Sequence, residues 1–423
     1  MSTFYRQWLL GSASMAVLCL RVAAAPFGTL VCAMGTPTDY RITTLDAADG
    51  AQQVLATGAT VFAGLDGAPC YGDPCVVGRL GAGGGINWLG GDGALRALVP
   101  QAARGANIDP CISFDQAYVA YVQRNASPSN EDILHVITVA TGADTPVYTT
   151  KLWGVDLAHP RFAPDSSRLI FALDDAFWGS RDIYAMPVAG GIPQELEDLP
   201  ENAMHPCYAP NGRLLACVAP YGGSFAAYIA NADGSNPRRI DLGGEFALFP
   251  CFSPCSRYLA VASDNGINIM DVSSGAVLTQ LPLDYDGYYG LAWHLDAQQC
   301  AASTLKVSVK STAIKATVAE FAPPPLPGFG ALWLDGVFTA FDNPALWLDK
   351  NGKKYVYRDK ALKYKCTYTL KKQSVAAAVK NLALAAGTDY RTGVPVRVTV
   401  NLGARTCSEV ITLDARGAYK RPR

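Results

Sequence analysis

The sequence predicts an all-β protein, in which a six-bladed β-propeller is followed by a small β-sandwich-like domain. Three observations lead to this prediction. The composition suits short strands joined by turns, one short phrase returns along the chain with a period in the forties, and a run of prolines separates an acidic part from a basic part.

The composition favours strands over long helices. Of the 423 residues, 50% are apolar and 17% are charged, and the chain has 40 Gly and 27 Pro. Such a balance is typical of many short strands that are joined by turns. After the N-terminal segment, no stretch reaches the roughly 20 apolar residues that a membrane-spanning helix needs.

The repeated phrase consists of a proline, a bulky residue two positions later and then a turn. It begins at Pro69, Pro110, Pro160, Pro206 and Pro250, which are 41, 50, 46 and 44 residues apart, and a degenerate copy surrounds Trp293. After most copies come an apolar run, a polar turn and an alternating run, as at residues 214–217 and 227–230. Units of this length with four strands each predict propeller blades.

The two ends of the repeat region are expected to close the ring together. Residues 28–50 look like the later part of a blade without its opening phrase, and the phrase around Trp293 can supply the missing strand. A blade built from both chain ends removes free strand edges, which otherwise favour aggregation. This gives five complete blades and one composite blade, or seven blades if residues 288–318 form a blade of their own.

The phrase resembles the repeats of a known family. The run from Pro160 to Asp165, the apolar strand after it and the run from Ile183 to Met186 are similar to TolB-like (WD40-like) propeller repeats, over about residues 27–318. The resemblance implies the fold and says little about function. The hydrolase domain that accompanies some of these propellers is not expected, because the chain has no Gly-x-Ser-x-Gly motif. The N-terminal domain of TolB is not expected either.

Four segments are expected: a signal peptide at 1–25, the propeller at 27–320, a proline-rich linker at 321–327 and a basic β-sandwich-like domain at 328–423. The apolar run from Trp8 to Leu20, followed by three alanines, indicates the signal peptide and a periplasmic, secreted or cell-surface protein; an uncleaved anchor or a cytoplasmic start is the alternative.

The charge balance reverses across the linker. Residues 1–322 hold 18 basic and 29 acidic side chains, whereas residues 323–423 hold 17 basic and 7 acidic ones. The C-terminal domain is therefore expected to bind an anionic partner, either the acidic propeller or an anionic polymer, and duplex nucleic acid is not expected. Its tract from Lys350 to Lys365 alternates lysines with Tyr355, Tyr357 and Tyr364, and we expect the tyrosines to face the core and the lysines to face water.

Candidate binding residues lie at the repeat phrase. His159 and His205 directly precede the prolines of neighbouring blades, so they are expected at the same height near the channel. Arg161, Trp293 and His294 belong to copies of the same phrase and complete the predicted binding site at the channel mouth. No catalytic residue, metal site or cofactor is predicted, because the chain has only four histidines and repetition of a turn residue explains the pair.

The cysteines are expected in two roles. Cys70, Cys111, Cys207 and Cys251 each follow a repeat proline and are not expected to pair between blades, because neighbouring blades pack about 10 Å apart and a disulfide needs Cα atoms within about 7 Å. A pair within one blade is possible for Cys207 with Cys217, and Cys111 and most of the propeller cysteines are expected to be reduced. Cys366 and Cys407 are the two cysteines of the C-terminal domain, and we expect them to form a disulfide after export.

These observations favour a non-catalytic binding or scaffold protein outside the cytoplasm, which recognises a protein segment or a glycan at the channel mouth. Two alternatives remain open. One is a propeller enzyme of the lactonase or lyase type, with acids and histidines that converge on the inner strands. The other is an envelope-anchoring protein that works through its basic C-terminal domain.

Overall fold

The computed structural model describes most of the chain. It covers residues 29–36, 39–58, 62–67, 76–80, 84–89, 95–100, 102, 105–114, 116–125, 131–150, 155–175, 180–243, 246–254, 256–283, 288–294, 305–310, 313–318, 330–334, 337–340, 346–351, 353–380, 395–402 and 405–420. The expected signal peptide and the linker at 321–327 lie outside these residues. No helix in the described ranges has the length and apolar character to span a bilayer.

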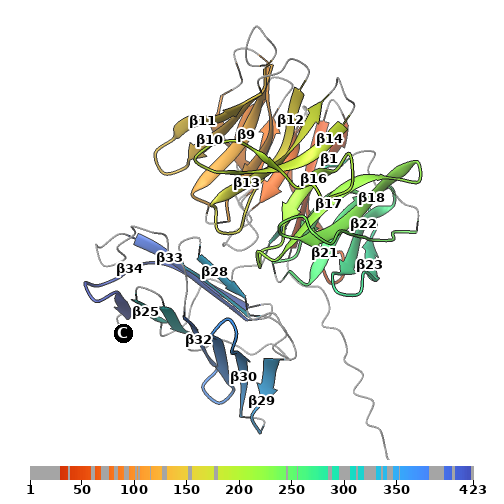
Figure 1. Cartoon of the computed structure of the whole chain (residues 1–423). Coiled ribbons are helices and arrows are strands. Elements are labelled where there is room, and N and C mark those ends of the chain that lie inside the picture. Colours follow the sequence, from red (N-terminus) through yellow and green to blue (C-terminus); the bar gives the residue numbers. More distant parts are fainter. Residues whose placement is uncertain are drawn as a thin grey trace, which may run out of the picture.

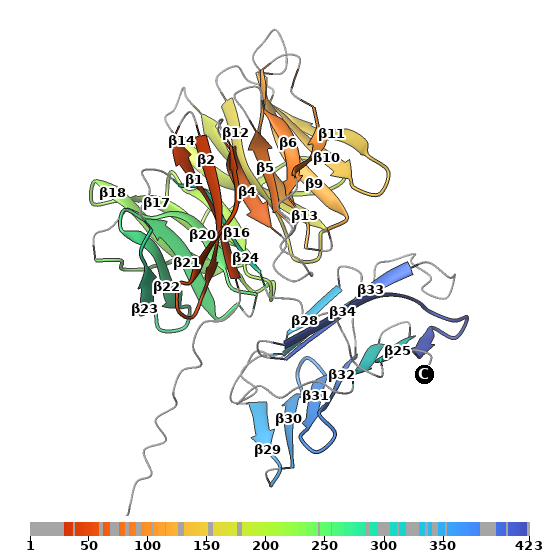
Figure 2. The ribbon, with the colours of Figure 1, turned by 180° about the vertical axis from the view of Figure 1, so that it is seen from behind.

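The first part of the chain is a six-bladed β-propeller (Figures 1 and 2). Five blades are each made of four consecutive strands, listed here from the inner strand outward. The blade of β4 (Phe62–Gly67) continues with β5 (Val76–Leu80), β6 (Gly85–Leu89) and β7 (Leu95–Val99), and the blade of β8 (Ala106–Ile112) continues with β9 (Tyr118–Arg124), β10 (Ile133–Thr138) and β11 (Ala143–Thr149). The other three are β12 (Val155–Phe162), β13 (Arg168–Asp175), β14 (Ser180–Pro187) and β15 (Gln194–Glu195); β16 (Met204–Tyr208), β17 (Leu214–Tyr221), β18 (Ser224–Asn231) and β19 (Arg238–Arg239); and β20 (Leu248–Phe252), β21 (Tyr258–Ser263), β22 (Gly266–Asp271) and β23 (Val277–Leu281).

The sixth blade joins the two ends of the propeller, as the sequence predicts. Its inner strand β24 (Tyr288–His294) pairs with β1 (Thr29–Thr36), and β2 (Asp39–Asp46) and β3 (Gln52–Gly58) follow outward. The inner strands contact one another in a closed cycle, and β24 also bridges to β4 through Gly290 and Leu65. A Cβ atom on Gly290 would lie 2.6 Å from the backbone nitrogen of Leu65, so only glycine allows this seam.

Each of the inner strands β4, β8, β12, β16 and β20 has a β-bulge. The pairing register shifts there, and the residue at the bulge has positive φ: Gly64, Asp109, His159, His205 and Phe249. Proline follows it in four of the five blades. Since a bulge leaves a backbone N–H outside the ladder, proline is tolerated at this place in a strand.

One copy of the repeat phrase was misplaced by the sequence. The phrase at Pro69 does not open the blade of β4 to β7. The inner strand of that blade, β4, already ends at Gly67, and its bulge is at Gly64. Gly64 is followed by leucine instead of proline, which explains why the pattern missed it. Cys70 lies outside the described residues.

The second part of the chain consists of two sheets around one core. A seven-stranded sheet has the order β29 (Trp347–Asp349), β30 (Lys354–Asp359), β31 (Tyr364–Thr369), β32 (Ser374–Lys380), β26 (Ala313–Val318), β25 (Leu305–Lys310) and β35 (Ala418–Lys420). A four-stranded sheet has the order β28 (Val337–Ala340), β27 (Gly330–Leu334), β33 (Pro395–Leu402) and β34 (Arg405–Thr412). Side chains from both sheets, among them Tyr357, Val379 and Val400, form one buried cluster.

The expected end of the propeller at residue 320 needs a correction. Strands β25 and β26 precede the proline run, yet they pair with β32 and β35 in the seven-stranded sheet. Their alternation buries Val307, Val309 and Ile314 in the core of that sheet, so their apolar face belongs to the second part of the chain. The residues that separate the two cores therefore lie between β24 and β25.

Candidate functional site

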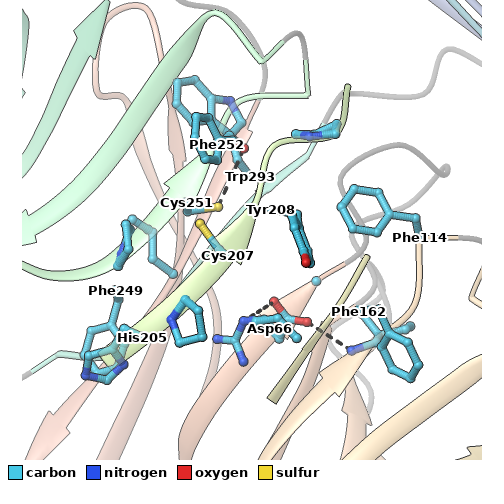
Figure 3. A pocket seen from close by; sticks show the side chains of 17 residues that line it. Asp66, Phe114, Phe162, His205, Cys207, Tyr208, Phe249, Cys251, Phe252 and Trp293 are labelled. Carbon is cyan, nitrogen blue, oxygen red and sulfur yellow. Dashed lines mark hydrogen bonds and ion pairs between the residues drawn. The ribbon is translucent and has the colours of Figure 1, made fainter. Parts of the chain in front are cut away.

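Three bulge residues form a stack on neighbouring inner strands. The imidazole rings of His159 and His205 lie with their centroids 3.8 Å apart, and the Phe249 ring meets His205 edge-on at 4.5 Å (Figure 3 shows the last two). Positive φ at all three positions turns their side chains toward the next blade rather than along their own strand. The sequence correctly placed the two histidines at equivalent positions of neighbouring blades.

Both histidines are held in the neutral form. Burial, together with the nearby positive charge of Arg161, lowers the pKa of His159 to about 3. Burial also lowers the pKa of His205 far below its usual range. The Nδ1 atoms of both rings are buried and lack a hydrogen-bond partner among the described residues. Neutral, stacked rings can therefore accept or donate a hydrogen bond but carry no charge at neutral pH.

The residue two positions after each bulge points toward the adjacent blade. Asp66 occupies this position in the blade of β4 to β7, where its Oδ2 accepts a hydrogen bond from the backbone N–H of Ile112, at 3.0 Å. Its Oδ1 lies 3.4 Å from Nε of Arg161, which holds the same position two blades on. Burial raises the pKa of the Asp66 carboxyl, and the Arg161 charge opposes that shift. The pair therefore links three blades through one carboxylate.

Cysteines occupy the same position in three other blades. Cys111 is buried, and the thiols of Cys207 and Cys251 point toward one another from neighbouring strands (Figure 3). The backbone of Phe252 lies within hydrogen-bonding reach of the Cys207 thiol, and that of Trp293 within reach of the Cys251 thiol. The sulfurs of Cys207 and Cys251 thus contact the next blade, as Asp66 does. All three cysteines are free, as the sequence predicts.

A small cavity lies inside the ring at this level, and we call it the central pocket (Figure 3). Its volume is about 50 Å³. Its lining residues come from inner strands around the ring and include Asp66, Arg161, His205, Cys207, Cys251 and Trp293. A cavity of this size holds a few water molecules at most.

A wider cavity, the entrance pocket, opens where the inner strands begin. Its volume is about 320 Å³. Three arginines, three aspartates and a histidine dominate its lining, which is made by Arg79, Ile108, Asp109, Arg124, Asp156, Ala158, His159, Asp174 and Arg181. The arginines come from β5, β9 and β14, so three neighbouring blades each supply one guanidinium.

Ion pairs hold two of these arginines in place. Nε of Arg124 lies 3.4 Å from the buried Asp132, and its Nη1 lies 3.8 Å from Asp156. Arg181 pairs with Asp174 on the adjacent strand. Arg79 has no ion pair with any carboxylate in the described ranges. The pocket therefore presents fixed donors and acceptors together with one uncommitted guanidinium.

The predicted site residues divide between these places. His159 lines the entrance pocket, whereas His205, Arg161 and Trp293 line the central pocket. Trp293 is fully buried, so it is a wall of the ring interior and not part of the mouth. His294 is 2% exposed and lies against Gly67 beside the central pocket, but it lines neither pocket. The sequence missed Asp66, although its distance of 45 residues from Cys111 fits the repeat period.

Two further predictions concern metals and the disulfide. Within the described ranges, no three metal-binding side chains are gathered in one place. The expected disulfide is not formed in the structure, because Cys366 is a free, buried cysteine on β31. Cys407 belongs to β34 in the other sheet.

The fold defines a six-bladed β-propeller protein with polar pockets at its axis, and comparisons with known proteins specify the type. Residues 89–284 match the family described as TolB beta propeller domain. The chain therefore carries a TolB-like β-propeller. A search of curated protein sequences finds no match.

Solved structures are similar to the propeller at low sequence identity. TolB from Acinetobacter baumannii aligns with a TM-score of 0.50 and 17% identity, over 63% of this chain and 66% of that chain. The alignment thus spans just under two thirds of the length of that TolB. A putative TolB from Agrobacterium tumefaciens aligns with a TM-score of 0.47 and 18% identity, over 62% of this chain and 90% of that chain. An oligogalacturonate lyase in complex with manganese aligns with a TM-score of 0.40 and 14% identity, over 84% of this chain and 98% of that chain.

Proposed function

We propose that this protein is a non-catalytic binding protein that works outside the cytoplasm and recognises a protein segment or a glycan at the entrance pocket. The observation that carries this proposal is the set of three arginines and three aspartates around an open cavity of about 320 Å³. The apolar N-terminal segment and the TolB-like propeller support a site outside the cytoplasm.

The balance of charges in the entrance pocket suits a polar ligand better than a strongly charged one. Three guanidinium groups face three carboxylates, and His159 between them is neutral. Peptide groups and sugar hydroxyls both carry donors and acceptors side by side, so they match such a lining. Ion pairs restrain Arg124 and Arg181 before binding, which reduces the entropy that a ligand has to overcome.

The volume of the central pocket supports binding rather than catalysis. Asp66 and His205, two of the buried groups with shifted pKa values, lie at this pocket, where about 50 Å³ leaves no room for a substrate. Asp66 also has both oxygens engaged, by Ile112 and Arg161. These contacts support a structural role for the carboxylate.

The experiment starts with a screen of the full chain against a peptide library and a glycan array. The strongest hits are then measured by calorimetry with Arg79→Glu and Asp156→Lys, which change the entrance pocket. Arg168→Glu and Asp198→Lys make the same charge changes at exposed positions of the propeller outside both pockets. We expect the two pocket variants to weaken binding about tenfold or more, because each reverses a charge that is expected to form a charge-assisted hydrogen bond with the ligand.

Equal affinities for the pocket variants and their matched controls would overturn the proposed site. Turnover of any hit by the wild-type protein would overturn the non-catalytic assignment.

A further inference from the structure

The outer face of the seven-stranded sheet follows directly from its register. On β32, Val375, Ala377 and Val379 are buried in the core, so the residues between them face outward. The pairing of β32 with β31 and β26 then carries the outward face across the sheet, since paired residues lie on the same side. The pairings of β30, β25 and β35 assign the outward residues of the remaining strands in the same way.

This outward face has cations and no carboxylates. The outward positions with described side chains on these six strands are Lys354, Val356, Arg358, Lys365, Thr367, Thr369, Ser374, Ala376, Ala378, Lys380, Lys315, Thr317, Lys306, Ser308, Ala418 and Lys420. Every charged side chain among them is exposed, and every charge is positive.

The cations form a band that crosses the sheet at right angles to the strands. Six consecutive strands each place one cation near the same level. Arg358, Lys365 and Lys315 share one row of paired positions, Lys306 and Lys420 lie in the adjacent row on one side, and Lys380 lies in the adjacent row on the other side. We call these six residues the cation band. Because neighbouring strands are about 4.8 Å apart, the band is roughly 25 Å long with about one positive charge per strand. No ion pair joins a band residue to a carboxylate in the described ranges.

Small polar and aliphatic side chains, and no aromatic ones, surround the band among the described outward positions. Thr317, Thr367 and Ser308 stand between its lysines on the same face. The tyrosines of this region point the other way: Tyr357 is buried, and Tyr355 and Tyr364 pack against the core. This confirms the sequence prediction for the tract. It also removes the stacking platforms that single-stranded nucleic acid requires.

We propose that the cation band binds a linear acidic polysaccharide that lies across the strands. A polymer with one carboxylate per sugar matches a band with about one cation per strand, and the threonine and serine hydroxyls meet its sugar hydroxyls. A planar bilayer is a poorer match, because no aromatic residue among the described outward positions flanks the band to enter the interface. The inference is independent of the function proposed for the propeller.

The test measures binding of the full chain to immobilised alginate at several salt concentrations. The band variant is Lys365→Gln/Lys315→Gln/Lys306→Gln. Its matched control is Lys350→Gln/Lys371→Gln/Lys372→Gln, which removes the same charge from exposed lysines at turns away from the band. We expect the band variant to bind roughly tenfold more weakly or worse, the control to bind like wild type, and wild-type affinity to fall as salt rises.

Several outcomes would overturn the proposal. They are no binding of wild-type protein to alginate at low salt, equal losses in the band variant and the control, and tighter binding to an oligodeoxythymidine or to anionic vesicles of equal charge. Binding to uncharged dextran at the same affinity would also contradict it. Because all six changes are at exposed side chains, circular dichroism is expected to show unchanged folding, which keeps the comparison valid.

Discussion

The imidazole rings of His159 and His205 stack with their centroids 3.8 Å apart, although the two residues belong to different blades. Each ring sits on a bulge with positive φ, and Asp109, the bulge residue of the preceding blade, accepts a hydrogen bond from the His159 backbone N–H at 3.1 Å. The bulges therefore join neighbouring blades to each other around the axis. Burial favours the neutral form of both rings. The stability of this junction therefore depends on pH, because protonation of a buried ring is unfavourable.

We predict that the two histidines lower the stability of the propeller in acid. Below their ordinary pKa of about 6.5, the unfolded chain binds protons at both rings, whereas the folded chain takes up the His159 proton only near pH 3. The contribution to stability is thus complete above pH 6.5 and is lost as the pH falls toward 3. The expected slope is about 1.4 kcal/mol per pH unit for each histidine.

Urea unfolding of wild type and of His159→Asn/His205→Asn between pH 7 and 4 checks this prediction. Asparagine adopts positive φ readily and does not titrate, so the variant isolates the imidazole charge. We expect a clearly shallower pH slope for the variant. The same slope in both proteins would contradict the assignment.

The sequence predicted the ring and its closure better than it predicted the pockets. The repeat spacing indicated the composite blade and the position of His159 and His205, because a bulge followed by proline leaves a mark in the sequence. The entrance pocket left no such mark in the sequence. Arg79 and Arg124 come from the second strands of their blades and Arg181 from the third strand of its blade, and only the packing of those blades brings them together.

We predict that Asp66 is a structural carboxylate. Asp66→Ala leaves the Ile112 N–H and the half-buried Arg161 without their acceptor, so we expect a loss of about 3 kcal/mol in the free energy of unfolding. Asp66→Asn retains an acceptor and is expected to cost about half as much. The double variant Asp66→Ala/Arg161→Met removes both charges and is expected to recover part of the loss. Chemical denaturation checks all three, and equal stabilities for the two single variants would contradict the role of the acceptor.

We also predict that the C-terminal domain folds from a fragment of residues 303–423 but not from one of residues 321–423. The shorter fragment lacks β25 and β26, which lie between β32 and β35. Without them β32 becomes a free edge, and the core loses Val307 and Ile314. Size-exclusion chromatography and thermal melts check this expectation. A monomeric 321–423 fragment that melts like the longer one would restore the boundary that the proline run indicates.

The last prediction concerns the cysteines, whose chemistry distinguishes packing from a disulfide framework. Cys32, Cys111, Cys207, Cys217, Cys251 and Cys366 are all free in the structure. Burial raises the pKa of Cys207 to about 12 and that of Cys366 to about 12, so about a thousandfold less of each thiol is ionised at neutral pH than in an exposed cysteine of pKa 9. Since the thiolate is the form that reacts, an alkylating reagent is expected to label these cysteines very slowly in the folded protein. After denaturation without reductant, all six are expected to react quickly, and mass spectrometry of the labelled peptides checks both states. Paired resistance of Cys207 and Cys251 in the denatured protein would reveal a disulfide between blades, and resistance of Cys366 would restore the pairing with Cys407.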